Sequence, residues 1–129
     1  MSGVVLKRQE LRHILMRIAL AFVFISIGIW EIVQPSYWSF YIPEFLTVLA
    51  SATTLTMFHG AVMLILGIAV LLGIRLKVSA GLCSIMMIAI IGDLIAAFGF
   101  NDIVIRDIAI LLLAVAIYLD DVKYLRLIV

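Results

Sequence analysis

Hydrophobic residues occupy four long segments of the chain, and each segment has a core without any charged residue. These cores cover residues 18–30, 60–74, 78–92 and 108–119. A helix needs about 20 residues, each rising about 1.5 Å, to cross the hydrocarbon layer of a membrane. All four cores are shorter than this, so each helix must extend beyond its core and include an ionisable residue. The pattern predicts helices over residues 14–33, 52–74, 77–97 and 104–119.

The composition favours a membrane protein. Of the 129 residues, 67% are hydrophobic and 13% are charged, whereas a soluble domain is about half apolar and about a quarter charged. The formal net charge of +1 provides no field that would attract nucleic acid, so we expect no nucleic-acid partner. We expect a single all-α domain over residues 1–129, an antiparallel four-helix transmembrane bundle in a lipid bilayer.

The basic residues predict the orientation of these helices. They lie before or within the first helix, between the second and third, and after the fourth, whereas residues 34–51 contain none. The positive-inside rule then places both termini in the cytoplasm. The residues concerned are Lys7, Arg8, Arg12, Arg17, Arg75, Lys77, Lys123 and Arg126. No small-residue cleavage site follows the first apolar run, so we expect an uncleaved helix and not a signal peptide.

The connection between the first two helices is rich in aromatic residues and contains no lysine or arginine. Tryptophan and tyrosine concentrate at the level of the lipid headgroups. We therefore expect a short segment in the outer membrane interface, with a short helix between Pro35 and Pro43. Its interfacial residues would be Trp30, Tyr37, Trp38 and Tyr41.

Five ionisable residues are predicted to lie in the outer half of the membrane. Glu31 is near the end of the first helix, His59 is in the second, Asp93 is in the third, and Arg106 and Asp107 begin the fourth. Ionisable residues at such depth normally face the interior of a bundle and pair with one another. The sequence thus predicts one intramembrane polar cluster.

Arg106 is the basic residue that departs from the positive-inside pattern. Neighbouring residues of a helix are about 100° apart, so we expect Arg106 and Asp107 to point in different directions. Arg106 would face inward with a stripe of small residues and pair with Asp93 or Glu31. That stripe is Ala109, Leu113 and Ala116. Two interpretations remain open, an anion or quinone-carbonyl site and an ion pair that sets helix register.

Other candidate chemistry is weaker. His59 and Met63 are four residues apart and could bind Cu(I), but two ligands on one helix do not make a site, and we expect His59 to hydrogen-bond a carboxylate instead. Cys83 is the only cysteine, which excludes thiol–disulfide chemistry within the chain, and we expect it to be buried. Arg17 is expected to reach the cytoplasmic interface, and His13 to take no part in the polar cluster.

An ordered set of short motifs resembles a known family. In chain order the motifs are Gly28-Ile29-Trp30-Glu31, Pro35 with Trp38 and Pro43, His59-Gly60 before an apolar run with Gly67, and Arg106-Asp107. This set is similar to the DoxX/DoxD-like family of small four-helix membrane proteins. The resemblance implies a subunit of a thiosulfate:quinone oxidoreductase or a membrane partner of redox enzymes, in a prokaryotic cytoplasmic membrane. One departure is the segment Val62-Met63-Leu64, where many relatives carry a glutamate.

Three functions follow from the sequence. The first is an accessory subunit that docks with or stabilises a larger membrane oxidoreductase, without catalysis by this chain alone. The second is a quinone-interacting redox subunit that uses Glu31, His59, Asp93 and Arg106. The third is an oligomeric carrier for a small anion or a proton.

Overall fold

The structure is a computed structural model that describes residues 2–120, with side chains from residue 8 onward. Every regular element in this range is helical, which confirms the all-α prediction. The chain forms four long helices, and three short helical elements connect the first long helix to the second. In chain order the elements are α1 (Ser2–Val33), α2 (Pro35–Trp38), η1 (Ser39–Tyr41), η2 (Glu44–Val48), α3 (Ala52–Leu72), α4 (Leu76–Phe98) and α5 (Asp102–Leu119).

The helix boundaries follow local capping chemistry. Ser51 caps α3 by accepting from Thr54 N, Asn101 caps α5 by accepting from Val104 N at 3.1 Å, and α3 ends at Gly73 in the left-handed region. The expected start of the first helix at residue 14 was wrong, because α1 begins at Ser2. Arginine, glutamate and leucine are good helix formers, so the helix continues beyond its apolar part.

Three helices are long and apolar enough to cross a membrane, judged by length and composition: Arg8–Val33 within α1, Ala52–Leu72 and Leu76–Phe98. The chain is therefore suited to a multi-pass position in a lipid bilayer. α5 is not among the three, although a fourth spanning helix was expected. It has 18 residues and carries three charged residues, Asp102, Arg106 and Asp107, in its first two turns, more than the most apolar stretch of each of the other three helices.

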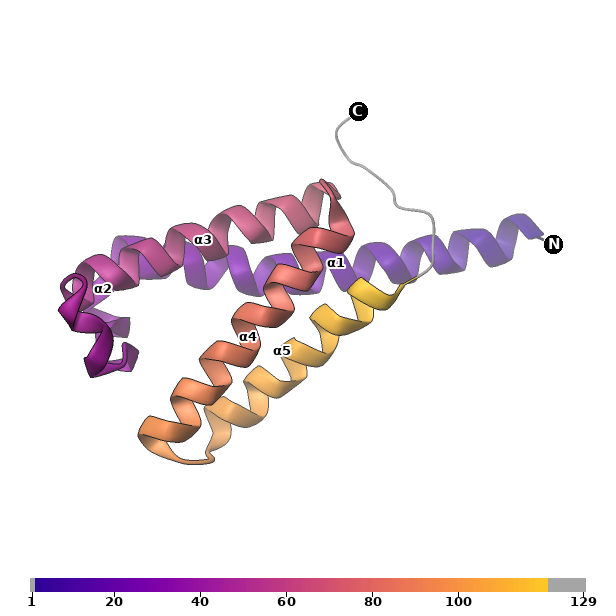
Figure 1. The fold of residues 1–129 in the computed structure, drawn as a ribbon. Helices are drawn as coiled ribbons and strands as arrows, with labels where there is room; N and C mark the ends of the chain where they lie inside the picture. The colour runs from indigo at the N-terminus through magenta and orange to yellow at the C-terminus, as the bar shows by residue number, and fades with distance from the viewer. Residues whose placement is uncertain (1, 121–129) are drawn as a thin grey trace.

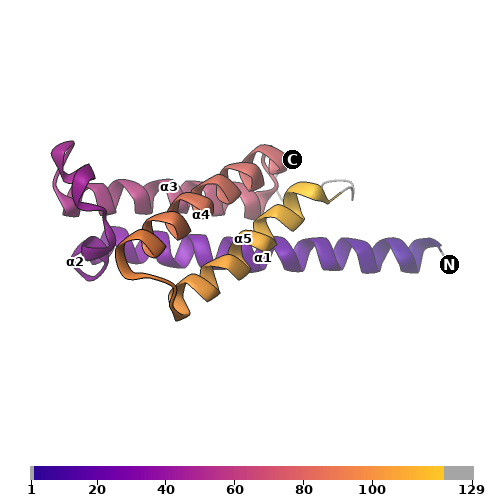
Figure 2. The ribbon, with the colours of Figure 1, turned by 60° about the horizontal axis from the view of Figure 1, so that its bottom comes forward.

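The long helices form two antiparallel pairs, α1 with α3 and α4 with α5 (Figures 1 and 2). The turn Gly73–Arg75 joins the pairs at one end. From that turn α4 and α5 run obliquely to α1 and α3, so that α3 and α4 diverge toward their other ends (Figure 1). α3 and α4 also contact each other, but each packs more extensively on another partner.

Glycines bring the backbones of α1 and α3 into direct contact. A Cβ atom added to Gly28 would lie 2.7 Å from Gly60 O, and one added to Gly60 would lie 2.7 Å from Gly28 O. Two turns further along α3, a Cβ on Gly67 would lie 2.8 Å from Ile25 Cγ1. Small residues at helix contacts allow this approach, which maximises van der Waals packing inside a membrane.

A core of buried apolar residues fills the region where the two pairs cross. It includes Leu20 and Phe24 of α1, Met63 and Val70 of α3, and Ala80, Cys83, Ile110 and Ala114 of the second pair. Cys83 is fully buried, as the sequence predicted.

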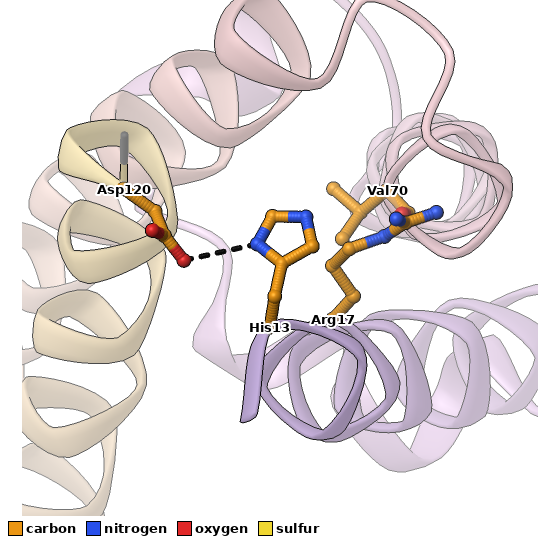
Figure 3. Close-up of polar contacts among 4 residues, drawn as sticks. All are labelled: His13, Arg17, Val70 and Asp120. Carbon is orange, nitrogen blue, oxygen red and sulfur yellow. Dashed lines mark hydrogen bonds and ion pairs between the residues drawn. The ribbon is translucent and has the colours of Figure 1, made fainter. Parts of the chain in front are cut away.

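A second polar layer, formed by His13, Arg17 and Asp120, lies away from the five ionisable residues of the predicted cluster. It holds the molecule together at the end near the turn Gly73–Arg75 (Figure 3). Arg17 is 2% exposed; its Nε donates to Val70 O at 3.0 Å and its Nη2 to Leu71 O at 2.8 Å. The last carbonyls of a helix lack partners within the helix, and a cation there also interacts favourably with the helix dipole. The expectation that Arg17 extends to the interface was therefore wrong.

His13 lies one turn before Arg17 and is fully buried. Its Nδ1 is 2.9 Å from Asp120 Oδ2, which connects α1 to the end of α5 (Figure 3). His13 is indeed outside the predicted outer cluster, but it has a structural role that the sequence analysis did not assign. Two of the basic residues used to predict the orientation, Lys123 and Arg126, lie outside the described residues.

Substituting Gly60 tests the backbone contact. Gly60→Ala should reduce the free energy of unfolding by about 1–3 kcal/mol, because the new Cβ would meet backbone on α1. Gly92→Ala is the matched control on α4, where an added Cβ meets no described atom within 4 Å, and its helix propensity should leave stability equal or slightly higher. Unfolding by SDS in mixed micelles, followed by circular dichroism, measures both; equal stability of the two variants would contradict the contact.

Substituting Arg17 tests the second polar layer. Arg17→Met should cost about 1–3 kcal/mol, since it keeps an unbranched side chain but leaves carbonyl groups at the end of α3 without their donors. Arg12→Met removes the same charge from an exposed position on α1 and should change stability by less than about 0.5 kcal/mol. The same unfolding titration measures both, and a neutral Arg17→Met would show that the guanidinium is not needed to hold α3.

Candidate functional site

A cavity of about 320 Å³ lies between the two helix pairs, at the end where α3 and α4 diverge. Every long helix and the connection between α1 and α3 contribute to its wall. The apolar part of the wall includes Val23, Ile27, Met63, Met87, Ile90, Leu94, Ile103 and Ile110. Ligand sites in proteins typically have volumes of roughly 300–1,000 Å³ and are lined mainly by apolar groups, so this cavity has room for one small ring.

All five residues of the predicted polar cluster line this cavity. Glu31 comes from the last turns of α1, His59 from α3, Asp93 from the last turns of α4, and Arg106 and Asp107 from the start of α5. Each helix thus delivers its ionisable residue at the same end of the molecule. The cavity is where these residues converge.

Glu31 and His59 form a close pair on the α1–α3 wall. His59 Nδ1 donates to Glu31 Oε1 at 2.7 Å, which confirms the predicted hydrogen bond from His59 to a carboxylate on another helix. The Glu31 side chain is 7% exposed and that of His59 is 30% exposed. A short bond between a buried carboxylate and an imidazole holds the ring in one orientation, and either group can accept or release a proton.

The expected partner and direction of Arg106 were both wrong. Its Nη2 lies 3.0 Å and its Nε 3.1 Å from Asp107 Oδ1, so it pairs with its neighbour and not with Asp93 or Glu31. The buried face of α5 runs through Val104, Asp107, Ile110, Ala114 and Ile117, and the Arg106 side chain is 51% exposed. The long arginine stem spans the angle between adjacent positions, so the guanidinium bends back to the buried carboxylate.

Asp93 is half-buried at the cavity wall. Within residues 8–120 no side chain forms an ion pair or hydrogen bond with its carboxylate. The cavity thus contains one unpaired carboxylate beside the Glu31–His59 and Arg106–Asp107 pairs. With neutral histidine, three carboxylates face one guanidinium, which gives the polar wall an excess of hydrogen-bond acceptors.

The connection between α1 and α3 forms part of the cavity wall. Between Pro35 and Pro43 this connection forms α2 and η1, which confirms the predicted short helix. The predicted interfacial residues form one aromatic cluster: Trp30 stacks on Tyr37 at 4.9 Å, and Trp38 lies 5.3 Å from Trp30 and 5.9 Å from Tyr41. Tyr41 also contacts Phe98 at the end of α4, so the cluster bridges the two helix pairs.

Three members of this aromatic cluster, Tyr37, Trp38 and Tyr41, line the cavity. Trp38 Nε1 is buried and has no hydrogen-bond partner among the described residues. Sequence reasoning assigned these aromatics to the membrane interface and did not predict that they would enclose a site. It also missed Thr56, which lines the cavity and donates to Ala52 O at 2.8 Å; its position one turn before His59 was the available signal.

The cavity does not resemble a metal site. The described residues contain no group of three or more His, Cys, Asp or Glu side chains arranged to hold a metal ion. Met63, the second proposed copper ligand, is 3% exposed and packs in the apolar core. The polar groups surround a space and do not converge on a point, which suits an organic ligand better than an ion.

Comparisons with known proteins give no further assignment. No protein-family model, no curated protein and no solved structure matches this chain. The functional argument therefore rests on the geometry of the cavity.

Proposed function

We propose that this chain is a multi-pass membrane protein that binds a quinone-class ligand in the cavity between its helix pairs, as a subunit of a larger membrane oxidoreductase. The observation that carries the proposal is a cavity with apolar walls, an aromatic cover and proton-exchanging groups, in a chain suited to a lipid bilayer. In this proposal all four long helices cross the membrane in an antiparallel bundle.

The walls suit a ring that arrives from the lipid phase. Met87, Ile90 and Ile110 supply apolar contact area, and Tyr37, Trp38 and Tyr41 offer aromatic faces for a planar ring. A quinone ring is planar and apolar except at its oxygens, so it requires both kinds of surface. The volume of the cavity accommodates the ring, while an isoprenoid tail would remain between the helices or in lipid.

The polar groups suit a ligand that exchanges protons. Quinones and hydroquinones differ by two electrons and two protons, so a quinone site requires groups that accept or release protons. Glu31 and His59, bonded at 2.7 Å, supply both a carboxylate and an imidazole at the cavity wall. A small anion would meet a worse environment, because Arg106 is already paired with Asp107 and three carboxylates would repel the anion. The cavity therefore favours the quinone alternative over the anion carrier.

The role as a subunit and the orientation rest on sequence arguments. The resemblance to the DoxX/DoxD-like family supports a place beside a larger oxidoreductase in a prokaryotic cytoplasmic membrane. The cavity lies at the end of the helices opposite Arg75 and Lys77. Since basic residues mark the cytoplasmic end, we place the termini in the cytoplasm and the cavity in the outer half of the bilayer.

Quenching of tryptophan fluorescence tests ligand binding. The chain has two tryptophans, and Trp30→Phe leaves Trp38 at the cavity wall as the single reporter. A benzoquinone with a short alkyl tail, added to this variant in lipid nanodiscs, should quench the emission saturably. Adding Ile90→Phe, which fills the cavity, should weaken the binding by about tenfold or more.

The matched control is Ile88→Phe, which adds the same volume to an exposed position of α4 and should leave binding unchanged. Non-saturable quenching that rises linearly with quinone and is equal in both variants would report partition into lipid and would contradict the proposed site.

A further inference from the structure

We infer that the cavity selects the reduced, hydroxyl-bearing ring and binds a hydroquinone more tightly than the corresponding quinone. This inference rests on the proposed function and specifies the form of the ligand that the site holds. It follows from the balance of hydrogen-bond donors and acceptors around the cavity.

The cavity wall offers free acceptors in its interior. Glu31 Oε1 is engaged by His59, which leaves the second carboxylate oxygen of Glu31 for another donor. The Asp93 carboxylate has no partner among the described side chains. A carboxylate accepts hydrogen bonds and, when ionised, donates none. Both groups therefore require donors from a ligand or from water.

Several donors at the wall are committed to protein acceptors, and others belong to exposed side chains. The Arg106 guanidinium donates to Asp107 through both Nε and Nη2, and the hydroxyl of Thr56 donates to Ala52 O. His59 donates through Nδ1 to Glu31. The remaining N–H groups of Arg106 and the hydroxyl of Tyr37 belong to side chains that are more than half exposed, so these donors can also bond to groups outside the cavity. The Tyr41 hydroxyl can both donate and accept. Trp38 Nε1 is a buried donor at the wall without a partner among the described residues.

The two redox forms of a quinone place opposite demands on such a wall. The quinone has two carbonyl oxygens, which only accept, so beside Glu31 and Asp93 it would set acceptor against acceptor. The hydroquinone has two hydroxyl groups, each of which donates one bond and can also accept one. It can donate to a carboxylate with one hydroxyl and accept from Trp38 Nε1 with the other. A site built to bond a ligand hydroxyl rejects the analogue that lacks it, because its own buried polar groups are left unpaired.

Calorimetric titration of the full-length protein in nanodiscs tests this selectivity. One short-tailed benzoquinone, its hydroquinone kept reduced under argon, and the dimethyl ether of that hydroquinone are compared as ligands. We expect the hydroquinone to bind about tenfold more tightly than the quinone, in line with one or two hydrogen bonds to charged groups. The dimethyl ether, which cannot donate, should bind no better than the quinone.

Asp93→Asn separates selectivity from general damage to the site. The amide keeps the size of the side chain but adds a donor, so hydroquinone affinity should fall and quinone affinity should rise. A variant that merely deforms the cavity would weaken both ligands. Glu44→Gln, at an exposed carboxylate that does not line the cavity, is the matched control and should change neither affinity.

The outcomes distinguish this inference from the proposed function. Equal binding of quinone, hydroquinone and dimethyl ether, each saturable and weakened by Ile90→Phe, would overturn the selectivity and leave the quinone site intact. Saturable binding of none of the three would overturn the proposed function as well. Tighter binding of the quinone than of the hydroquinone would also overturn the selectivity.

Discussion

The backbone contact between α1 and α3 at Gly28 and Gly60 determines the geometry of the site. Each glycine lies where a Cβ would be 2.7 Å from the carbonyl oxygen of the other. Glu31 is one turn after Gly28, and His59 directly precedes Gly60, so the contact that packs the helices also places the carboxylate 2.7 Å from the imidazole. With larger residues the helices would separate, and the buried Glu31 carboxylate would lose its bond to His59 at a cost in free energy.

The cavity results from how the second helix pair meets the first. Arg17 and His13 connect α1 to the ends of α3 and α5, close to the turn Gly73–Arg75, so the two pairs are held together at that end (Figure 3). At the other end they diverge, and the aromatic cluster bridges the opening through the contact of Tyr41 with Phe98. One end is therefore fixed by buried polar bonds, while the other encloses space.

The helices could be predicted because their signals are local. Apolar runs, the capping residues Ser51 and Asn101, and Gly73 mark boundaries within the sequence itself. The partnership of His59 with a carboxylate was also predictable, since an ionisable side chain within an apolar helix normally pairs with another polar group. The cavity could not be predicted, because its volume depends on the angle between the helix pairs. That angle arises only when all side chains pack together.

The errors concern side-chain direction. Arg106 was assigned to the buried face from a stripe of small residues, but the rotation of α5 about its axis places Asp107 there instead. Arg17 was assigned to the interface because it lies at the inner end of the first apolar segment, although its spacing of four residues from His13 put both on one helix face. Such choices depend on which neighbour each face meets, and a single sequence does not specify this.

Photoaffinity labelling with an azido-substituted, short-tailed quinone would test the central claim most directly, since it maps where the ring resides. We predict that mass spectrometry will find the label on residues from both helix pairs that line the cavity, such as Met63 and Met87, and that excess unlabelled ligand will prevent it. Labelling confined to exposed apolar residues outside the cavity, such as Ile88 and Leu112, unaffected by competitor, would contradict the account.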